Sequence, residues 1–289
     1  MSNFLRQYSL TLGEGDNSPV IGLSEDRTLR TTFDVTHEWG GNRSMANIAV
    51  YGLSRATEGR IFKQYDKISL SAGYVDSIGL IFGGEIRNVV KERNGPDRIT
   101  RIFALSESFV TDTTSISASL GQGTTVVDII KICAEVLGLP VVIQEDDFAD
   151  EPVYARGKPL IGEPMPIMRN LSDAHEFDFT VENGRLRVLK RGSALSNAPV
   201  IIGQDSGMIG SPEVTEVGAN VSVNLTPKIR LGQKFEIDSR TPQVSISSVL
   251  YQNIQTTVDV GTYTAMEINH TGDTHSDNWE TKLTGHRFG

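Results

Sequence analysis

Four side chains near the C-terminus of this 289-residue chain have the types and the spacing of metal ligands. His270, Asp273, His275 and Asp277 follow one another closely, and imidazole and carboxylate groups are common zinc ligands. If His270, Asp273 and His275 converged on one ion, they would form the site of a metal-assisted hydrolase. In such a site the metal activates a water molecule. However, Asp side chains also close turns by accepting hydrogen bonds from nearby backbone. We therefore predict no metal, no cofactor and no catalytic residue here, and keep the hydrolase as the alternative.

The segments on either side of these residues have the composition of β-strands. Residues 263–269 and 279–283 flank a polar turn, so the turn is predicted to close a hairpin of an all-β domain. Trp39 and Trp279 are predicted to pack in β cores or to anchor contacts, because aromatic residues are enriched at interface centres. We therefore name five candidates for contact with a neighbouring subunit or partner: Trp39, Asp273, His275, Asp277 and Trp279.

The bulk composition excludes several classes of protein. A single cysteine, Cys133, rules out a disulfide framework and a cysteine-based zinc site. With 27 basic and 36 acidic residues the formal charge is -9, which is unfavourable for sequence-specific nucleic-acid binding, because neutralising phosphates needs clustered Lys and Arg. The same charge suits a surface that DNA slides past. We find no apolar run of about 18 residues and no signal-peptide pattern, so we expect no membrane insertion.

The chain reads as three successive regions, β, then α+β, then β. Residues 1–110 contain five or six short strands, among them the alternating segment 29–39, with Asn94-Gly95 in a tight turn. Short strands at this spacing predict a small barrel or sandwich.

Residues 111–198 are predicted to form an α+β middle domain between two linkers, 110–123 and 191–198. Apolar residues at steps of three and four predict a helix over 124–137, and a second helix is predicted over 164–175. Asn183-Gly184 predicts a type I′ hairpin turn. Residues 199–289 return to β texture with six or seven strands. This last region is similar in size and strand count to residues 1–110, which raises the hypothesis of a pseudo-duplication.

Three other motifs have simple structural interpretations. The acidic run 145–151 lacks the glycine and glutamate spacing of a calcium loop. Gly121-Gln122-Gly123 precedes a helix and could bind an anion, but the rest of a dinucleotide fingerprint is missing, so helix capping is favoured. Cys133 falls on the apolar face of its helix and is predicted to be a core thiol. Neither a Gly-x-Ser-x-Gly elbow nor a P-loop is present.

Several strand and turn segments, taken in order, resemble a known family. They include Ala46-Asn47-Ile48-Ala49-Val50-Tyr51-Gly52-Leu53-Ser54, Ile81-Phe82-Gly83-Gly84-Glu85-Ile86, Asn224-Leu225-Thr226-Pro227, and His270-Thr271-Gly272-Asp273 leading to Trp279. This order is similar to that of the baseplate hub proteins of contractile-tailed bacteriophages, the late-control-protein-D-like group related to the N-terminal half of type VI secretion spike proteins.

The resemblance implies a fold and a structural role. The fold would be mainly β with a smaller α+β insert, as two tail-tube-like β-barrels flanking an α/β domain. Three copies would form a pseudo-six-fold ring that joins the tail tube to the central spike and permits DNA passage. The implied partners are a second and third copy of the chain, the tail tube protein, the spike or needle protein and other baseplate proteins. The implied location is the tail baseplate of the virion, after assembly in the host bacterial cytoplasm. A carbohydrate- or receptor-binding β module remains a further alternative, although no groove for it can be located.

Overall fold

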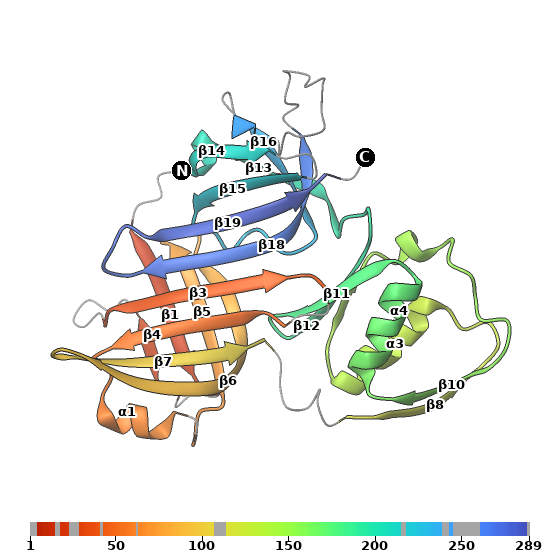
Figure 1. Cartoon of the computed structure of the whole chain (residues 1–289), viewed down its shortest axis with the longest axis horizontal. Coiled ribbons are helices and arrows are strands. Elements are labelled where there is room, and N and C mark those ends of the chain that lie inside the picture. Colours follow the sequence, from red (N-terminus) through yellow and green to blue (C-terminus); the bar gives the residue numbers. More distant parts are fainter. Residues whose placement is uncertain are drawn as a thin grey trace, which may run out of the picture.

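The computed structural model of the chain is mainly β (Figure 1). It describes residues 5–14, 18–22, 29–40, 43–61, 63–106, 114–214, 218–238, 243–244 and 261–287. No helix among these residues is long and apolar enough to cross a membrane.

The first β unit contains strands β1 to β7 and one short helix. They are β1 (Arg6–Leu12), β2 (Val20–Gly22), β3 (Thr31–Glu38), β4 (Met45–Tyr51), α1 (Arg55–Arg60), β5 (Lys67–Tyr74), β6 (Gly79–Asn94) and β7 (Asp97–Leu105). Buried and exposed residues alternate along β3, as its sequence predicts. The Gly95–Pro96 turn joins β6 to β7, with Gly95 at φ 59°, a conformation that glycine adopts without steric cost.

The middle region packs two helices against short strands (Figure 1). Its elements are β8 (Ile116–Leu120), α3 (Val126–Leu137), β9 (Val141–Ile143), η1 (Glu145–Phe148), β10 (Lys158–Gly162), α4 (Pro164–Ala174), β11 (Phe177–Glu182) and β12 (Arg185–Lys190). A capping box between Thr125 and Asp128 starts α3, and Gly138 ends it in the left-handed conformation. Both helices and the Asn183-Gly184 hairpin lie where the sequence predicts them.

The predicted linkers are partly wrong. Residues 116–120 form β8, which pairs with β10, a strand that we did not predict, and β13 begins at Ser196, inside the second predicted linker. The strand expected over 243–252 lies mostly outside the described residues, which include only β17 (Gln243–Val244).

The second β unit contains β13 to β19. They are β13 (Ser196–Gly203), η2 (Gln204–Ser206), β14 (Met208–Val214), β15 (Gly218–Asn224), β16 (Gln233–Asp238), β17, β18 (Thr262–Asp273) and β19 (Trp279–His286). The turn between β18 and β19 closes a hairpin, which confirms that part of the sequence analysis.

The two β units repeat one strand order. In space the first runs β3–β4–β7–β6–β5–β1, and the second runs β14–β15–β19–β18–β16–β13. Corresponding strands follow one another in the same chain order. A bulge recurs at the same place, because the register shifts between Ile86 and Asn88 in β6 and between Ala265 and Glu267 in β18. The units differ at one end, where β1 is antiparallel to β5 but β13 is parallel to β16. The similar size of the two ends therefore reflects a repeated topology.

The two units share one continuous sheet. Strand β3 of the first unit pairs with β18 of the second over seven residues, from Thr32–Asp273 to Glu38–Glu267. The fourteen described strands of this sheet form an open path and do not close into two hydrogen-bonded barrels, because β1 pairs only with β2 and β5, and β13 only with β16.

The close contact between β6 and β7 gives a stability prediction at two adjacent glycines. A Cβ atom on Gly84 would lie 2.1 Å from the Leu105 carbonyl oxygen, whereas one on Gly83 would meet nothing nearer than 3.8 Å. Gly84→Ala is therefore expected to lower the free energy of unfolding by about 1–3 kcal/mol, as overpacking does. Gly83→Ala is the matched control and should change it by less than about 0.5 kcal/mol. Urea denaturation of both variants provides the measurement, and equal losses would contradict the packing argument.

Candidate functional site

His270 is a core residue that contacts a threonine and a second histidine. Its ring is buried, and Nδ1 lies 2.8 Å from the Thr281 hydroxyl. The His37 ring packs edge-on against it with the centroids 5.8 Å apart. Burial, together with His37 and Arg230, lowers the pKa of His270 well below its usual value, so this imidazole is neutral at pH 7.

Asp273 forms an ion pair and closes its own turn. Arg30 donates two hydrogen bonds to its carboxylate, at 3.2 Å from Nε and 2.7 Å from Nη2, and the backbone N–H of His275 donates a third at 2.9 Å. Burial by itself would raise the pKa of Asp273, but these hydrogen bonds outweigh it and lower the pKa. The turn therefore follows the backbone-bonding interpretation of its sequence.

The residues named for the hydrolase alternative do not form a shared metal site in the described structure. His270 points into the core, Asp273 is held by Arg30, and the side chains of His275 and Asp277 are exposed. Within the described part of the chain no group of three or more His, Cys, Asp or Glu residues could share an ion. The exposed His275 and Asp277 remain predicted contact residues, and Asp277 already accepts a hydrogen bond from Arg6 through its carbonyl.

Each of the two tryptophans packs in the core of the β unit to which it does not belong. Trp39 follows β3 of the first unit but packs in the core of the second, where its indole N–H donates to the Ala265 carbonyl at 3.2 Å. Trp279 begins β19 of the second unit but packs in the core of the first, and donates to the Gly73 carbonyl at 3.2 Å. Only 8% and 2% of their surfaces are exposed. Both indoles thus stabilise the joint inside one chain, and little of either remains to contact a partner.

A buried charge cluster lies where the middle region meets both β units. The Glu182 side chain, 2% exposed, lies 3.2 Å from Arg187 Nε and 3.6 Å from Arg230 Nη1. Arg187 donates to the Leu231 carbonyl, and Arg230 donates to the Leu80 carbonyl, each at 2.9 Å. Burial lowers the pKa of Arg187 and Glu182 opposes that shift. The cluster connects β12, β6 and the segment before β16.

Hydroxyl groups complete this junction around the end of β11. Ser44 and Ser106 both donate to the Val181 carbonyl, at 3.2 Å and 2.7 Å. Ser44 also lies 2.7 Å from His37 Nδ1, and His37 Nε2 lies 2.8 Å from the Ile81 carbonyl. We name this set, together with Glu182, Arg187 and Arg230, the junction cluster. The sequence did not predict this cluster, because Glu182 was interpreted only as the start of a hairpin turn.

One face of the shared sheet is polar and acidic. The core-facing residues of β3, β15, β18 and β19 alternate with partly or fully exposed ones. Across the strands these exposed residues form rows, for example Ser222, Lys282, Asn269 and Thr36. Asn269 donates to Asp34 at 2.7 Å and to Thr36 at 3.0 Å. On these four strands the face carries four acids and one lysine: Asp34, Glu38, Glu267, Glu280 and Lys282. It therefore lacks the clustered cations that would hold nucleic acid.

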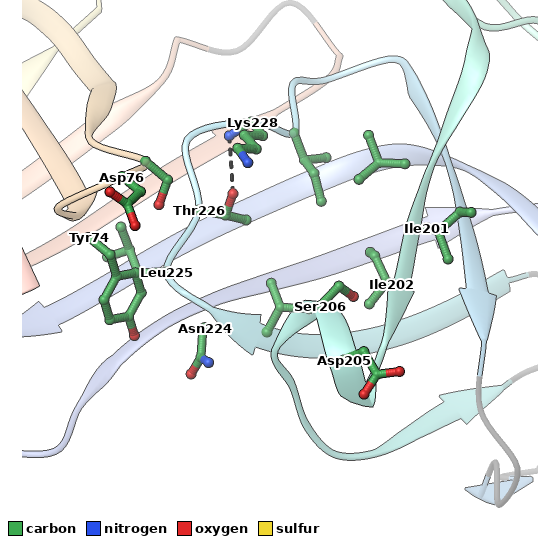
Figure 2. A pocket seen from close by; sticks show the side chains of 14 residues that line it. Tyr74, Asp76, Ile201, Ile202, Asp205, Ser206, Asn224, Leu225, Thr226 and Lys228 are labelled. Carbon is green, nitrogen blue, oxygen red and sulfur yellow. Dashed lines mark hydrogen bonds between the residues drawn. The ribbon is translucent and has the colours of Figure 1, made fainter. Parts of the chain in front are cut away.

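A cavity of about 310 Å³ lies between the first unit and β13, η2 and β15 of the second (Figure 2). Its lining is mostly apolar, and its charged members are Asp76, Asp205 and Lys228. It contains neither histidine nor cysteine.

The remaining chemical motifs have structural partners. Glu151 forms an ion pair with Lys190 and lies 2.7 Å from His175 Nδ1, and these two contacts lower the pKa of Glu151. The Thr125–Asp128 capping box occupies the start of α3. Cys133 is buried, and burial raises its pKa to about 12, so its thiol is inert at pH 7.

The fold is that of phage tail proteins. The 43 kDa tail protein of prophage MuSo2 from Shewanella oneidensis matches 98% of this chain and 97% of its own, with a TM-score of 0.60 at 8% identity. A tail protein from Neisseria meningitidis MC58 matches the same shares with a TM-score of 0.59 at 10% identity. The E. coli c3393 protein, a type VI secretion component, matches 97% of this chain and 77% of its own, with a TM-score of 0.59 at 9% identity.

The family itself is identified by sequence. The model of the family Baseplate hub gp41 matches residues 42–252, well over half of the chain, and comparison with curated protein sequences found no significant match. The chain belongs to the baseplate hub gp41 family, which confirms the resemblance seen in its strand and turn segments. It is a structural component of a phage tail baseplate.

The junction cluster gives a prediction about Glu182. Glu182→Gln removes the carboxylate that pairs with both Arg187 and Arg230, and breaking a buried ion pair leaves a charge uncompensated. We expect the free energy of unfolding to fall by about 3–5 kcal/mol in denaturant titrations. Glu92→Gln is the control, because Glu92 pairs with Arg101 at an exposed site and should cost at most about 1 kcal/mol. Equal losses of unfolding free energy in the two variants would show that the buried pair contributes no more to stability than the exposed one.

The buried histidines predict a loss of stability in mild acid. Burial lowers the pKa of His37 and of His270, so between about pH 6.5 and their lowered values the unfolded chain binds more protons than the folded one. Stability should fall as the pH drops through this window, by up to about 1.4 kcal/mol per pH unit for each histidine. His270→Asn keeps a side-chain partner for Thr281 and should reduce this slope in urea midpoints measured from pH 7.5 to 5. The exposed His275→Asn is the control, and identical slopes in both variants would contradict the assignment.

Proposed function

We propose that three copies of this chain form a ring that joins the tail tube of a contractile phage tail to its central spike and lets DNA pass. The observation that carries the proposal is the repeated strand order of the two β units. A chain that contains two equivalent units can convert three-fold symmetry into pseudo-six-fold symmetry. Each unit would act as a tail-tube-like barrel, with the α+β region of residues 111–198 placed between them.

The polar face of the shared sheet is the proposed channel wall. In a ring this face would meet DNA, and the acids of β3, β18 and β19 would repel phosphates, while the one lysine on these strands offers little attraction. The charge of the whole chain has the same sign.

The proposed partners follow from the position of a hub. The E. coli type VI secretion component with the same fold is described as structurally similar to the phage T4 tail proteins gp27 and gp5. We propose that the present chain binds the tail tube protein on one side, the spike or needle protein on the other, and further baseplate proteins around its rim. It would assemble in the host bacterial cytoplasm and act without catalysis, as part of the virion.

The ring can be tested directly. The purified chain is mixed with its tail tube and spike proteins and examined by mass photometry and negative-stain microscopy. We expect three-fold rings with a central channel, and a mass contribution of three times 31.6 kDa from this chain. The same measurement on the chain with each partner alone shows which contact drives assembly. A chain that stays monomeric when both partners are present would overturn the proposal.

A further inference from the structure

The long strand β18 uses one of its edges for two successive partners. Residues Thr262–Thr264 pair with β16, and after the bulge Glu267–Asp273 pair with β3 of the other unit. This second pairing is the joint between the two β units. One edge of a single strand therefore holds its own unit together and also binds the next one.

Strand β6 is the equivalent of β18, but the second half of the corresponding edge is open. Strand β5 pairs with Gly79–Glu85, on the same side of the same bulge as β16 pairs with β18. On that edge, residues Asn88–Asn94 have no partner strand in the described part of the chain. The β6–β7 hairpin extends from the unit here (Figure 1), and the side chains from Val90 to Asn94 are exposed.

Strand β14 is the equivalent of β3 and offers the complementary edge. On the side away from β15, Glu213 and Val214 pair with β17, and among the described residues no strand covers 208–212. Ile209 is 42% exposed there. Unpaired strand edges are templates for association with another chain.

The repeat also sets the register of the two edges. Counting from the bulges, Asn94 of β6 corresponds to Asp273 of β18. Ile209 faces Ser222 in β15 as Thr32 faces Ala49 in β4, so Ile209 corresponds to Thr32. The register of β14 against β15 then shifts between Ile209 and Glu213, so the repeat fixes the register of the receiving edge at Ile209. Because Asp273 pairs with Thr32 inside the chain, the equivalent pair between copies is Asn94 with Ile209.

We propose that the tip of the β6–β7 hairpin pairs with residues 208–212 of β14 in a neighbouring copy, with Asn94 opposite Ile209. This interface rests on the proposed ring and specifies how its copies are joined. Every unit then meets the next through the same kind of strand pairing, alternately within one chain and between two.

A cysteine pair tests the register. Residues directly opposite each other on neighbouring strands have Cβ atoms about 4.5–5.5 Å apart, so Asn94→Cys with Ile209→Cys should form disulfides between copies under mild oxidation. The native Cys133 is buried and does not compete. The expected result is a covalent trimer as the main product on a non-reducing gel. Arg93→Cys with Ile209→Cys is the matched control, because a shift of one residue puts the two side chains on opposite faces of the sheet.

A second variant tests the backbone bonds without cross-linking. Asn94 and Asp97 flank a two-residue turn and so form a hydrogen-bonded pair, which leaves the N–H of Arg93 facing the open edge. Arg93→Pro removes that donor and should raise the concentration needed for half-assembly about tenfold, the change expected for one interstrand hydrogen bond. Arg93→Ala keeps the N–H and should assemble like the unaltered chain.

The outcomes separate this interface from the ring itself. If the unaltered chain forms rings but the Asn94–Ile209 cysteine pair cross-links no better than its control, or Arg93→Pro assembles like Arg93→Ala, the interface is wrong and the ring stands. If the unaltered chain forms no ring with its partners, the proposed function fails, and the interface fails with it.

Discussion

A buried carboxylate between two arginines is the constraint on which the arrangement of this chain depends. Glu182 ends β11, and its partners come from β12 and from the segment before β16. The free donors of Arg187 and Arg230 are satisfied by carbonyls of the second and the first β unit respectively. Charges that are removed from water must be paired, so the cluster is complete only when all three parts of the molecule are in place. The hydroxyls of Ser44 and Ser106 on the Val181 carbonyl reinforce the same point.

The shared sheet and the junction cluster join different parts of the molecule. The sheet connects the two β units through seven backbone pairs between β3 and β18, which fix their relative position in one plane. The junction cluster fixes the middle region against both of them from the side. Because its bonds are directional, an apolar contact of the same area would allow more sliding than this polar one.

Local signals in the sequence were sufficient for part of the fold. The helix over 124–137 and the hairpin at Asn183-Gly184 depend on caps and turn residues that are close in sequence, and both were predicted. Strands β8 and β10 were not, because their pairing joins segments about forty residues apart and neither shows clean alternation. The turn at 273–277 was predicted to close a hairpin, but the partner of Asp273, Arg30, lies 243 residues away. Glu182 gave no signal at all, since burial of a charge depends entirely on distant parts of the chain.

The exchanged tryptophans have a consequence for how such a protein can change over evolutionary time. Each β unit keeps its own strand order, yet the core of each is completed by an indole that the other supplies. A recombination event that replaced one half would remove a large aromatic side chain from the half that was kept, and leave a cavity there. The two units of this chain, although repeated in topology, therefore each depend on a tryptophan that the other supplies.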